Sequence, residues 1–291
     1  MKLGLQIPSF TWPGGDAAIG PTLARIVETA DQAGIDSLWV MDHYWQIRSV
    51  GRAEEPMLEG MTALGYMAAH SRRARLGLMV GGIHYRQAPL WIKSTTTLDV
   101  LSGGRAWFGI GAAWNEAESR GLGFRWPPLA ERFRMLEETL QMARQMWSEE
   151  QGSEQPFEGR TVHAERLLNS PQALSRPRVP IMIGGGGEQK TLRLVARYAD
   201  ACNVFGDAEG IAHKYAVLRE RCEEEGRLYE EIERSTLQRV DLAKEEPAEV
   251  VERFGRLADA GAQHIIFNFK QVSDSAQLER LLRALEPLRA A

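Results

Sequence analysis

Residues 37–47 read SLWVMDHYWQI, an apolar run of strand length that ends in Asp42 and His43. Tyr44 and Trp45 follow in what we expect to be a loop. The run therefore predicts a strand with a carboxylate and an imidazole at its C-terminal end. Taken alone, such a pair is more typical of a turn that begins at an aspartate and carries a surface histidine. It indicates a site if the strand belongs to an α/β sheet, where chemistry takes place at that end.

Strand-like and helix-like segments alternate along the whole chain. Strands are predicted at 2–8, 37–42, 75–82, 106–112, 179–184, 201–205, 235–243 and 264–269. Helices are predicted at 21–34, 58–71, 89–101, 128–149, 188–199, 207–226, 247–261 and 274–289. Eight such units are the count of a (β/α)8 TIM barrel, an α/β fold. A doubly wound open sheet uses the same alternation, but eight units favour closure, so we predict one barrel domain over residues 1–291.

The chain is about forty residues longer than a typical barrel of this kind. Most of the surplus lies at about 150–178, between the fourth helix and the fifth strand, and is rich in Pro, Gly, Ser and Arg. Within it, PFEGRTVHAE (156–165) predicts a short hairpin that turns at Gly159. We expect this insertion near the top of the barrel, where it would cover a site.

Composition and charge exclude several classes of protein. The formal net charge of −4 and the pI near 6.0 argue against a nucleic-acid partner. No signal-peptide pattern and no run of about 18 apolar residues is present, so we expect a cytoplasmic protein without a membrane partner. Cys202 and Cys222 lack a CxxC motif or a histidine-rich neighbourhood, so neither a disulfide nor a metal site is indicated. GxSxG and HExxH motifs are absent, which disfavours simple hydrolysis and metal catalysis.

The segment IMIGGGGEQKTLRLVARYAD, 181–200, runs from a strand through four glycines into an amphipathic helix. Backbone N–H groups free of side chains, together with the helix N-terminus, suit a phosphate. The segment is not a Walker loop, because Gln189 stands where that motif requires glycine before Lys190. A flexible turn would need only one or two glycines. We therefore expect an anion at Gly184, Gly185, Gly186 and Gly187, with Lys190 adding charge.

Two further strand ends carry candidate ligand contacts. In FGIGAAWNEAE, 108–118, Ala112 leaves room beside the strand. Asn115 suits either a ligand or the N-cap of a helix, with Glu118 three residues on. In RLGLMVGGIHYRQAP, 75–89, Val80, Gly81 and Gly82 suggest an unusual backbone at the end of the third strand. His84 follows in a loop, where we expect it to be exposed and incidental.

Three segments together resemble the luciferase-like flavin and deazaflavin oxidoreductases: WVMDHYWQI, LGLMVGGIHYRQAPLWIKSTTTLDVLSGGRAWFGIGAAWNEAE and IMIGGGGEQKTLRLVARYADACNVFG. The resemblance covers nearly the whole chain, and the order of motifs is similar to the branch that uses coenzyme F420. It implies a non-prolyl cis peptide at Met79-Val80, or alternatively at Val80-Gly81. It also implies that the cofactor phosphate lies on Gly184 to Gly187. The implied cofactor contacts as a whole are Asp42, Met79, Val80, Gly81, Ala112, Asn115 and the four glycines.

The resemblance leads us to expect an F420-dependent oxidoreductase that transfers hydride between the deazaflavin C5 and an organic substrate. His43 would act as general acid or base, and Asp42 would orient it or contact the cofactor. We see no set of basic residues suited to a sugar phosphate, and Trp12, Trp45 and Trp114 would wall a space for an apolar or aromatic small molecule. The alternatives are an FMN-dependent monooxygenase and a non-catalytic flavin- or deazaflavin-binding barrel. The family commonly forms homodimers, which we expect here as well.

Overall fold

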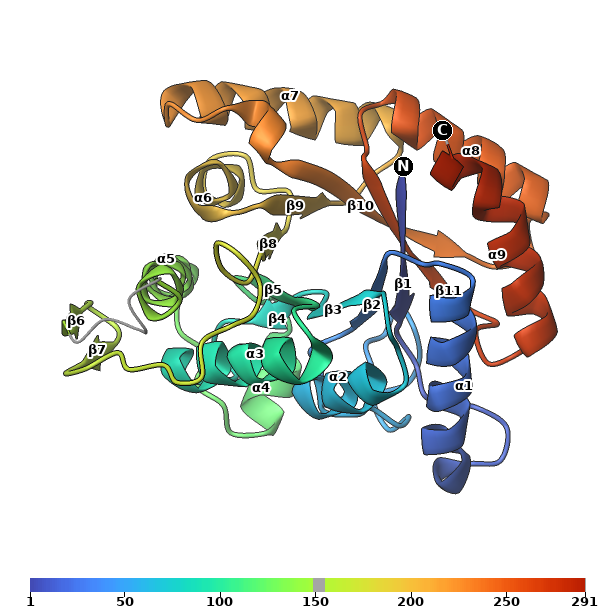
Figure 1. Ribbon diagram of the computed structural model, residues 1–291, viewed down its shortest axis with the longest axis horizontal. Helices are drawn as coiled ribbons and strands as arrows, with labels where there is room; N and C mark the ends of the chain where they lie inside the picture. Colours follow the sequence, from blue (N-terminus) through green and yellow to red (C-terminus); the bar gives the residue numbers. More distant parts are fainter. Residues whose placement is uncertain (149–154, 291) are drawn as a thin grey trace.

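The computed structural model describes residues 1–148 and 155–290 and shows a ring of parallel strands surrounded by helices (Figure 1). The strands follow the order β3-β2-β1-β11-β10-β9-β8-β5-β4, and pairing of β3 with β5 closes the ring. β3 and β4 share one position, so the barrel has eight. The closing pair confirms the (β/α)8 barrel and excludes the open sheet. The strands are β1 (Lys2–Ile7), β2 (Ser37–Val40), β3 (Arg75–Leu78), β4 (Gly81–Gly82), β5 (Ala106–Gly111), β8 (Ile181–Gly184), β9 (Ala201–Val204), β10 (Glu233–Val240) and β11 (His264–Phe269).

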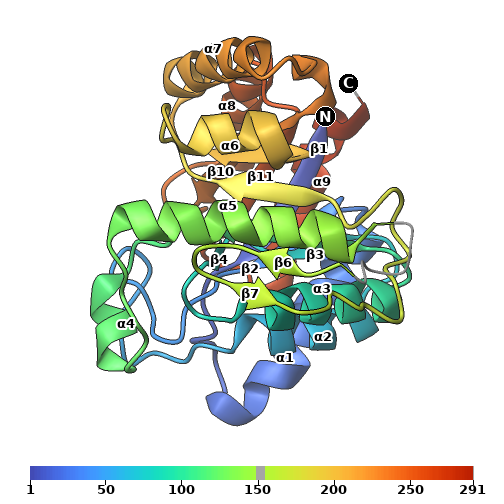
Figure 2. The same cartoon turned by 90° about the vertical axis from the view of Figure 1, so that its left-hand side faces the viewer.

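The helices cover the outside of the barrel (Figures 1 and 2). They are α1 (Ile19–Gln32), α2 (Gly60–Ala69), α3 (Ala88–Ser102), α4 (Glu116–Gly121), α5 (Leu129–Met146), α6 (Thr191–Tyr198), α7 (Ala208–Glu224), α8 (Pro247–Asp259) and α9 (Ser275–Ala290). The pattern missed α4, which is too short to show a helical period. None of the helices in the described ranges has the length and apolar content that a membrane span requires.

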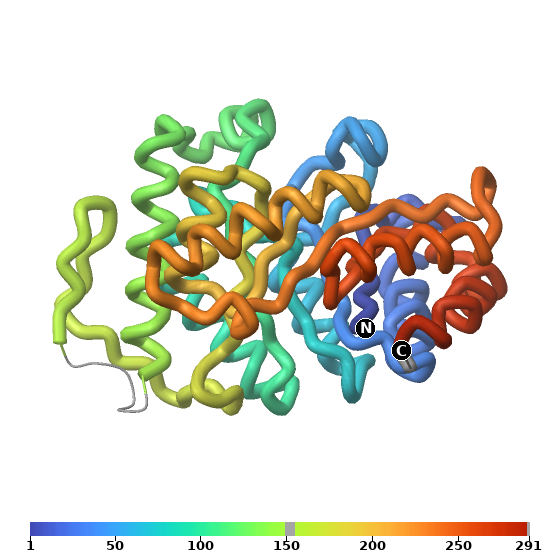
Figure 3. The backbone as a smooth tube through the Cα atoms, turned by 90° about the horizontal axis from the view of Figure 1, so that it is seen from above, coloured from blue at the N-terminus to red at the C-terminus, as the bar shows by residue number. Residues whose placement is uncertain are grey.

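The two ends of the chain lie side by side (Figure 3). The Met1 amino group donates a hydrogen bond of 2.9 Å to the Leu288 carbonyl oxygen, and β1 pairs with β11. The first and last strands are therefore neighbours in the ring, and their contact joins segments more than 250 residues apart in sequence.

The strand sequences explain why the barrel is solid. β2 and β5 are buried along their whole length, as expected for parallel strands covered on both faces. Side chains that point inward fill the interior in one small cluster, while a larger apolar core lies between the strands and the helices. The inner cluster consists of Trp39, Met79, Trp107, Met182, Ala201 and Ile266.

A break between β3 and β4 shapes the upper part of the barrel. The peptide bond between Met79 and Val80 is cis, which is the position that the resemblance implies. At the same level, a Cβ atom on Gly109 of β5 would lie 1.9 Å from the Leu78 carbonyl oxygen. Only glycine allows the two strands to approach this closely. Val80 and Gly81, which follow Met79, line a cavity at the C-terminal end of the barrel.

The insertion forms the predicted hairpin, from β6 (Phe157–Glu158) and β7 (His163–Ala164), and the N–H of Gly159 donates to the Val162 carbonyl oxygen. Glu138 of α5 holds its turn by accepting hydrogen bonds from the backbone of Arg160 and Thr161. The hairpin lies on the outer side of α5 (Figure 2), and no residue from 155 to 178 lines the cavity at the strand ends. The expectation that it covers the site is therefore wrong; residues 150–154 of the insertion lie outside the described ranges.

Candidate active site

The C-terminal ends of the strands surround a cavity of about 720 Å³. This volume lies in the usual range for small-molecule and cofactor sites. All eight positions of the barrel contribute residues at or just beyond their strand ends, which are Gln6, Met41, Gly81, Gly111, Gly184, Asn203, Gln238 and Asn268. The predicted strand-end segments thus meet at one place, as the barrel fold requires.

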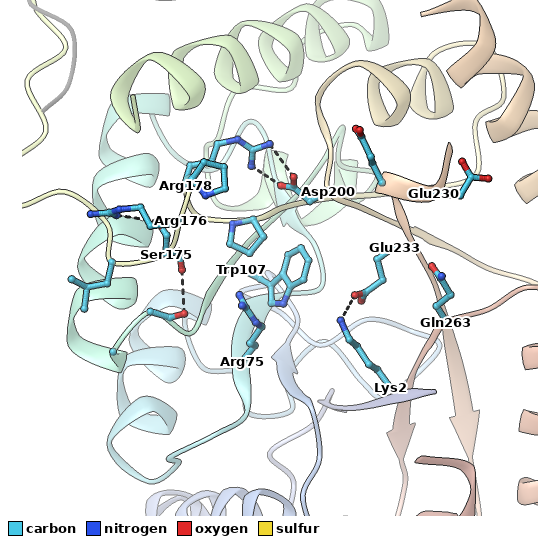
Figure 4. Close-up of a pocket in the computed structure, with 16 residues that line it drawn as sticks. Lys2, Arg75, Trp107, Ser175, Arg176, Arg178, Asp200, Glu230, Glu233 and Gln263 are labelled. Atoms are coloured by element: carbon cyan, nitrogen blue, oxygen red, sulfur yellow. Dashed lines mark hydrogen bonds and ion pairs between the residues drawn. The ribbon is translucent and has the colours of Figure 1, made fainter. Parts of the chain in front are cut away.

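A second hollow, of about 630 Å³, lies at the opposite end of the barrel (Figure 4). Ion pairs hold its wall together: Lys2 Nζ lies 2.5 Å from Glu233, and Arg178 lies 2.5 Å from Asp200. Gly103 and Gly104 also line it, and Gly103 is the left-handed C-cap of α3. This end of a barrel serves stability, so the hollow is not the candidate active site.

Histidines outside the main cavity make structural pairs. His264 is buried between Ser37 Oγ, at 2.8 Å, and Glu233, at 2.7 Å, near the hollow of Figure 4. Three further histidines pair with surface glutamates, in His70–Glu28, His163–Glu158 and His213–Glu188. Within the described part of the chain, no group of His, Cys, Asp or Glu is arranged to hold a metal ion, and both cysteines are buried and free.

The four glycines, Gly184 to Gly187, form one wall of the cavity. Gly185 has φ +121°, a conformation open to glycine alone, and its N–H donates to the Asn203 carbonyl oxygen at 2.9 Å. Within the described residues the N–H groups of Gly186 and Gly187 have no hydrogen-bond partner, and α6 begins four residues later. Free backbone donors beside a helix N-terminus are suited to an anion.

Lys190 does not add its charge to this loop, which corrects the expectation from the sequence. Its ammonium lies 5.3 Å from the centre of the Phe133 ring, in a separate depression on the outer surface. The lysine beside the loop is Lys214 of α7, which pairs with Glu188 at 2.6 Å. Its distance of 24 residues from Lys190 explains why local sequence did not indicate it.

Val80 forms the floor of the cavity between the glycine loop and β5. Its Cγ2 atom would lie 2.7 Å from a Cβ on Gly184 and 2.9 Å from a Cβ on Gly111. Both strand ends therefore need glycine to accommodate the Val80 side chain. Met79 and Gly81 line the same cavity. A flat ligand in this cavity would lie against the Val80 side chain and the glycine backbone around it.

His43 lies at the rim of the cavity, as the strand pattern predicts. Its side chain is 11% exposed, and its Nδ1 atom lies 2.7 Å from Glu118 Oε2. Its ring and that of Trp114 pack in a T-shaped arrangement, with 5.4 Å between ring centres. Burial raises the pKa of the Glu118 carboxyl, but hydrogen bonds from His43, Tyr85 and the backbone outweigh burial and hold it below its ordinary value. Glu118 is therefore an ionised group beneath the imidazole.

Asp42 does not orient His43, which corrects the first of its two expected roles. Its buried carboxylate accepts hydrogen bonds of 2.8 Å from Arg86 and one of 2.9 Å from the Gly82 N–H. Arg86 also pairs with Glu59. Asp42 is absent from the cavity wall, so the expected contact with the cofactor has no support either. Its carboxylate ties the end of β2 to the loop that follows β4.

Of the two roles considered for Asn115, the structure shows the helix cap. Its Oδ1 accepts from the Glu118 N–H at 3.4 Å, and its Nδ2 donates to Glu118 Oε2 at 3.1 Å. Ala112 lines the cavity and leaves space there, whereas Asn115 does not line it. The predicted contact between Asn115 and the cofactor therefore has no support in this geometry.

Asn203 is a polar group that the sequence interpretation missed. It is fully buried at the end of β9, lines the cavity and donates to Ser235 Oγ at 2.9 Å. Its Oδ1 atom has no hydrogen-bond partner among the described residues. An unpaired buried acceptor costs free energy unless a ligand or water supplies a donor. In the sequence, Asn203 stands out as a single amide within the apolar strand run ACNVF, and this position could have indicated it.

Only one of the three tryptophans expected to wall the substrate space does so. Trp114 lines the cavity and is 64% exposed. Trp12 belongs to the main core and packs on Phe10, and Trp45 packs against Gly121 of α4.

His84 is buried rather than exposed, which is a further correction. Its Nε2 lies 2.5 Å from Ser119 Oγ. Burial and the nearby charge of Arg132 lower the pKa of His84 to about 4, so it is neutral at physiological pH. It lies behind Tyr85, outside the main cavity, and lines a separate depression beside the hairpin.

The chain is similar in sequence to a known family and to several enzymes. Residues 1–289 match the family model described as luciferase-like monooxygenase. An F420-dependent glucose-6-phosphate dehydrogenase of Kineococcus radiotolerans is 31% identical over 262 residues, which are 87% of this chain and 71% of that protein. The enzyme of the same name from Nocardia farcinica is 34% identical over 183 residues, 61% of this chain and 49% of its own length.

Solved structures agree on the fold. The F420-dependent tetrahydromethanopterin reductase of Methanopyrus kandleri has a TM-score of 0.79 at 15% identity, with 99% of each chain covered. An F420-dependent secondary alcohol dehydrogenase has a TM-score of 0.80 at 16% identity, with 98% of each chain covered. At these identities the likeness shows the barrel alone, while the family model covers nearly every residue. The chain belongs to the luciferase-like monooxygenase family.

Proposed function

We propose that this protein is an oxidoreductase that uses coenzyme F420 and exchanges hydride with an organic substrate. The observation that supports it most is a single cavity that brings together an imidazole, a glycine loop with free N–H groups and the Val80 floor. The relatives at about one-third identity are named for F420-dependent dehydrogenation. When bound, F420 supplies a two-electron hydride donor or acceptor at ring carbon C5.

The residues present fit such a cofactor. Gly186 and Gly187 offer N–H groups to a phosphate, and Val80 offers a flat apolar support for a ring system. The orphaned Asn203 Oδ1 suits an N–H of a heterocycle or a ribityl hydroxyl, each of which would satisfy it. Met79, Gly81, Ala112, Gly184 and Gly185 complete this side of the cavity.

His43 is the proposed general acid or base. It is the one histidine that lines the cavity within the described residues. In the strand order, Val80 and β5 lie between β2, which leads to His43, and β8, which leads into the glycine loop. An imidazole there can protonate a substrate oxygen as hydride arrives, or take a hydroxyl proton as hydride leaves. Both directions balance, because the substrate gains or loses one hydride and one proton.

The substrate we propose is a small apolar or aromatic compound. Apolar side chains form much of the cavity wall, and three of them, Trp114, Leu129 and Phe205, are more than half exposed at its rim. Arg239 carries the only permanent charge among the described residues that line it. A sugar phosphate, for which the relatives are named, would need more cationic groups than this to replace its hydration.

A side-by-side titration with F420, FMN and NADPH tests the choice of cofactor. We expect F420 to bind and the other two to bind much more weakly. Tight FMN binding would favour a flavin-dependent monooxygenase, the activity after which the family is described. Binding of F420 without turnover on any panel of alcohols, ketones and activated alkenes would favour a non-catalytic binding protein.

Substitution of His43 tests the proton-transfer role. General acid–base catalysis typically contributes about 10²–10⁴-fold, so His43→Ala should lower kcat by that order while the Kd for F420 changes only a few-fold. His163→Ala is the matched control, because that imidazole lies on the hairpin outside α5. Near wild-type turnover in His43→Ala, or loss of cofactor binding as its sole defect, would contradict the assignment. The homodimer and the cytoplasmic location stay predictions.

A further inference from the structure

The carboxylate of Glu118 is the centre of a hydrogen-bond cluster under the candidate active site. Its side chain is fully buried at the start of α4. Oε1 accepts from the backbone N–H groups of Tyr44 and Trp45, at 2.5 and 2.7 Å. Oε2 is within hydrogen-bond distance of His43 Nδ1 at 2.7 Å, Tyr85 Oη at 2.6 Å and Asn115 Nδ2 at 3.1 Å. One carboxylate thus serves five groups from three loops.

An ionised carboxylate can accept hydrogen bonds but cannot donate one. The low pKa of Glu118 keeps it ionised, so the hydrogen in its contact with His43 must come from the imidazole. Nδ1 of His43 therefore carries a proton in the neutral as well as the charged form. The other ring nitrogen, Nε2, has no protein partner among the described residues and is not fully buried. Because His43 lines the cavity, Nε2 is open to it.

We propose that Glu118 is a positioning residue that holds His43 in the Nδ1–H tautomer, so that Nε2 is the atom that gives or takes the proton in catalysis. This inference rests on the proposed role of His43. Because Glu118 also accepts from the Tyr44 and Trp45 N–H groups, it holds the backbone that carries the imidazole as well as the ring. The neutral ring then presents a lone pair to the substrate, and the charged ring presents a proton.

Replacement of Glu118 by glutamine changes the side chain only by exchanging one carboxylate oxygen for an NH2 group. An amide has one acceptor oxygen and one NH2 group, whereas all five neighbours of Glu118 are donors. If the oxygen stays with the backbone N–H groups, the NH2 group faces His43 Nδ1, and the favoured tautomer becomes Nε2–H. Nε2 would then be a donor in the neutral ring and could no longer accept a proton.

The tautomer is measured directly by proton–nitrogen correlation NMR of the imidazole in the protein without cofactor. We expect Nδ1–H in the wild type and Nε2–H, or a mixture, in Glu118→Gln. In serine proteases the corresponding carboxylate-to-amide change lowers kcat about 10⁴-fold through the wrong tautomer. We therefore expect kcat of Glu118→Gln to fall about 10²–10⁴-fold, with the Kd for F420 within threefold of wild type. Glu116→Gln is the matched control, since Glu116 lies on the exposed face of α4 and pairs with Arg120.

The wild-type spectrum alone can overturn the inference: Nε2–H as the main neutral tautomer of His43 would show that Glu118 does not set it. If Glu118→Gln folds, retention of Nδ1–H with wild-type kcat would overturn it too. Should that variant not fold, the wild-type measurement still decides. The tautomer is read without cofactor or turnover, so failure of F420 to bind would refute the proposed function and leave this result standing.

Discussion

Gly109→Ala is a severe test of how the barrel forms the cavity floor. A Cβ on Gly109 would lie 1.9 Å from the Leu78 carbonyl oxygen and 3.1 Å from its carbonyl carbon. Ordinary contact begins at 3.4 Å, so the two backbones would have to separate by 1.5 Å (3.4 − 1.9). The chain beyond Leu78 is fixed by the hydrogen bond of 2.9 Å from the Met79 N–H to the Val40 carbonyl oxygen. The strain therefore cannot be relieved by a rotamer change.

We expect Gly109→Ala to lower the free energy of unfolding by about 3 kcal/mol, the upper end of typical overpacking costs. Urea denaturation measures it. Gly65→Ala is the matched control, because Gly65 lies within α2 and a Cβ there would meet nothing within 4 Å. That substitution should stabilise the protein by about 0.5–1 kcal/mol. The same chemical change thus has opposite expected signs at the two positions.

The two variants also separate stability from binding. Movement of Leu78 would displace Met79 and Val80, so the folded fraction of Gly109→Ala should bind F420 more weakly. A stability within about 0.5 kcal/mol of wild type would refute the close approach of β3 and β5. Lower stability with unchanged F420 affinity would instead remove the Val80 floor from the cofactor site.

Two further substitutions test groups outside the proposed chemistry. Asp42→Ala should lower the free energy of unfolding, measured by urea denaturation, by about 3–5 kcal/mol, because the buried Arg86 keeps only Glu59 as its ionic partner. Unchanged stability with lost turnover would instead indicate that Asp42 takes part in catalysis. Burial raises the pKa of Glu233, but His264 and Lys2 together outweigh burial and lower this pKa from 4.5 to about 2. The Glu233 carboxylate therefore stabilises the fold above pH 4.5 and loses its effect as the pH falls toward 2. The stability difference between wild type and Glu233→Gln should shrink by about 3 kcal/mol over that window, and a constant difference would contradict it.

The sequence predicted those features that depend on local pattern. Alternating strand and helix segments gave the barrel, and the ends of strands located His43 and the four glycines in one cavity. Turn chemistry located the hairpin at Gly159. These features depend on periodicity and on backbone conformations that neighbouring residues determine. The position of the cis peptide at Met79-Val80 came from the resemblance, since no pattern of residue types indicates it.

Side-chain partners could not be predicted in the same way, because they depend on which strand ends meet. The two side-chain contacts below the site, His43 with Glu118 and Asp42 with Arg86, join residues 75 and 44 positions apart. Either histidine or arginine would have been a reasonable partner for Asp42 from the sequence. Closure of the ring and the rotation of each strand end decide between them. Glu118 was also concealed by α4, which is too short to show a helical period.

The two sides of the cavity are built differently, and this should separate binding from turnover. The proposed cofactor side consists mainly of glycines, together with Met79, Val80, Ala112 and Asn203, so its shape depends largely on backbone positions. The proton-transfer side consists of the His43 and Glu118 side chains, and the His43 ring packs against Trp114. Residues without shared partners usually act additively. Substitutions at His43 or Glu118 should therefore change kcat with little change in cofactor affinity, whereas Gly109→Ala should change affinity first.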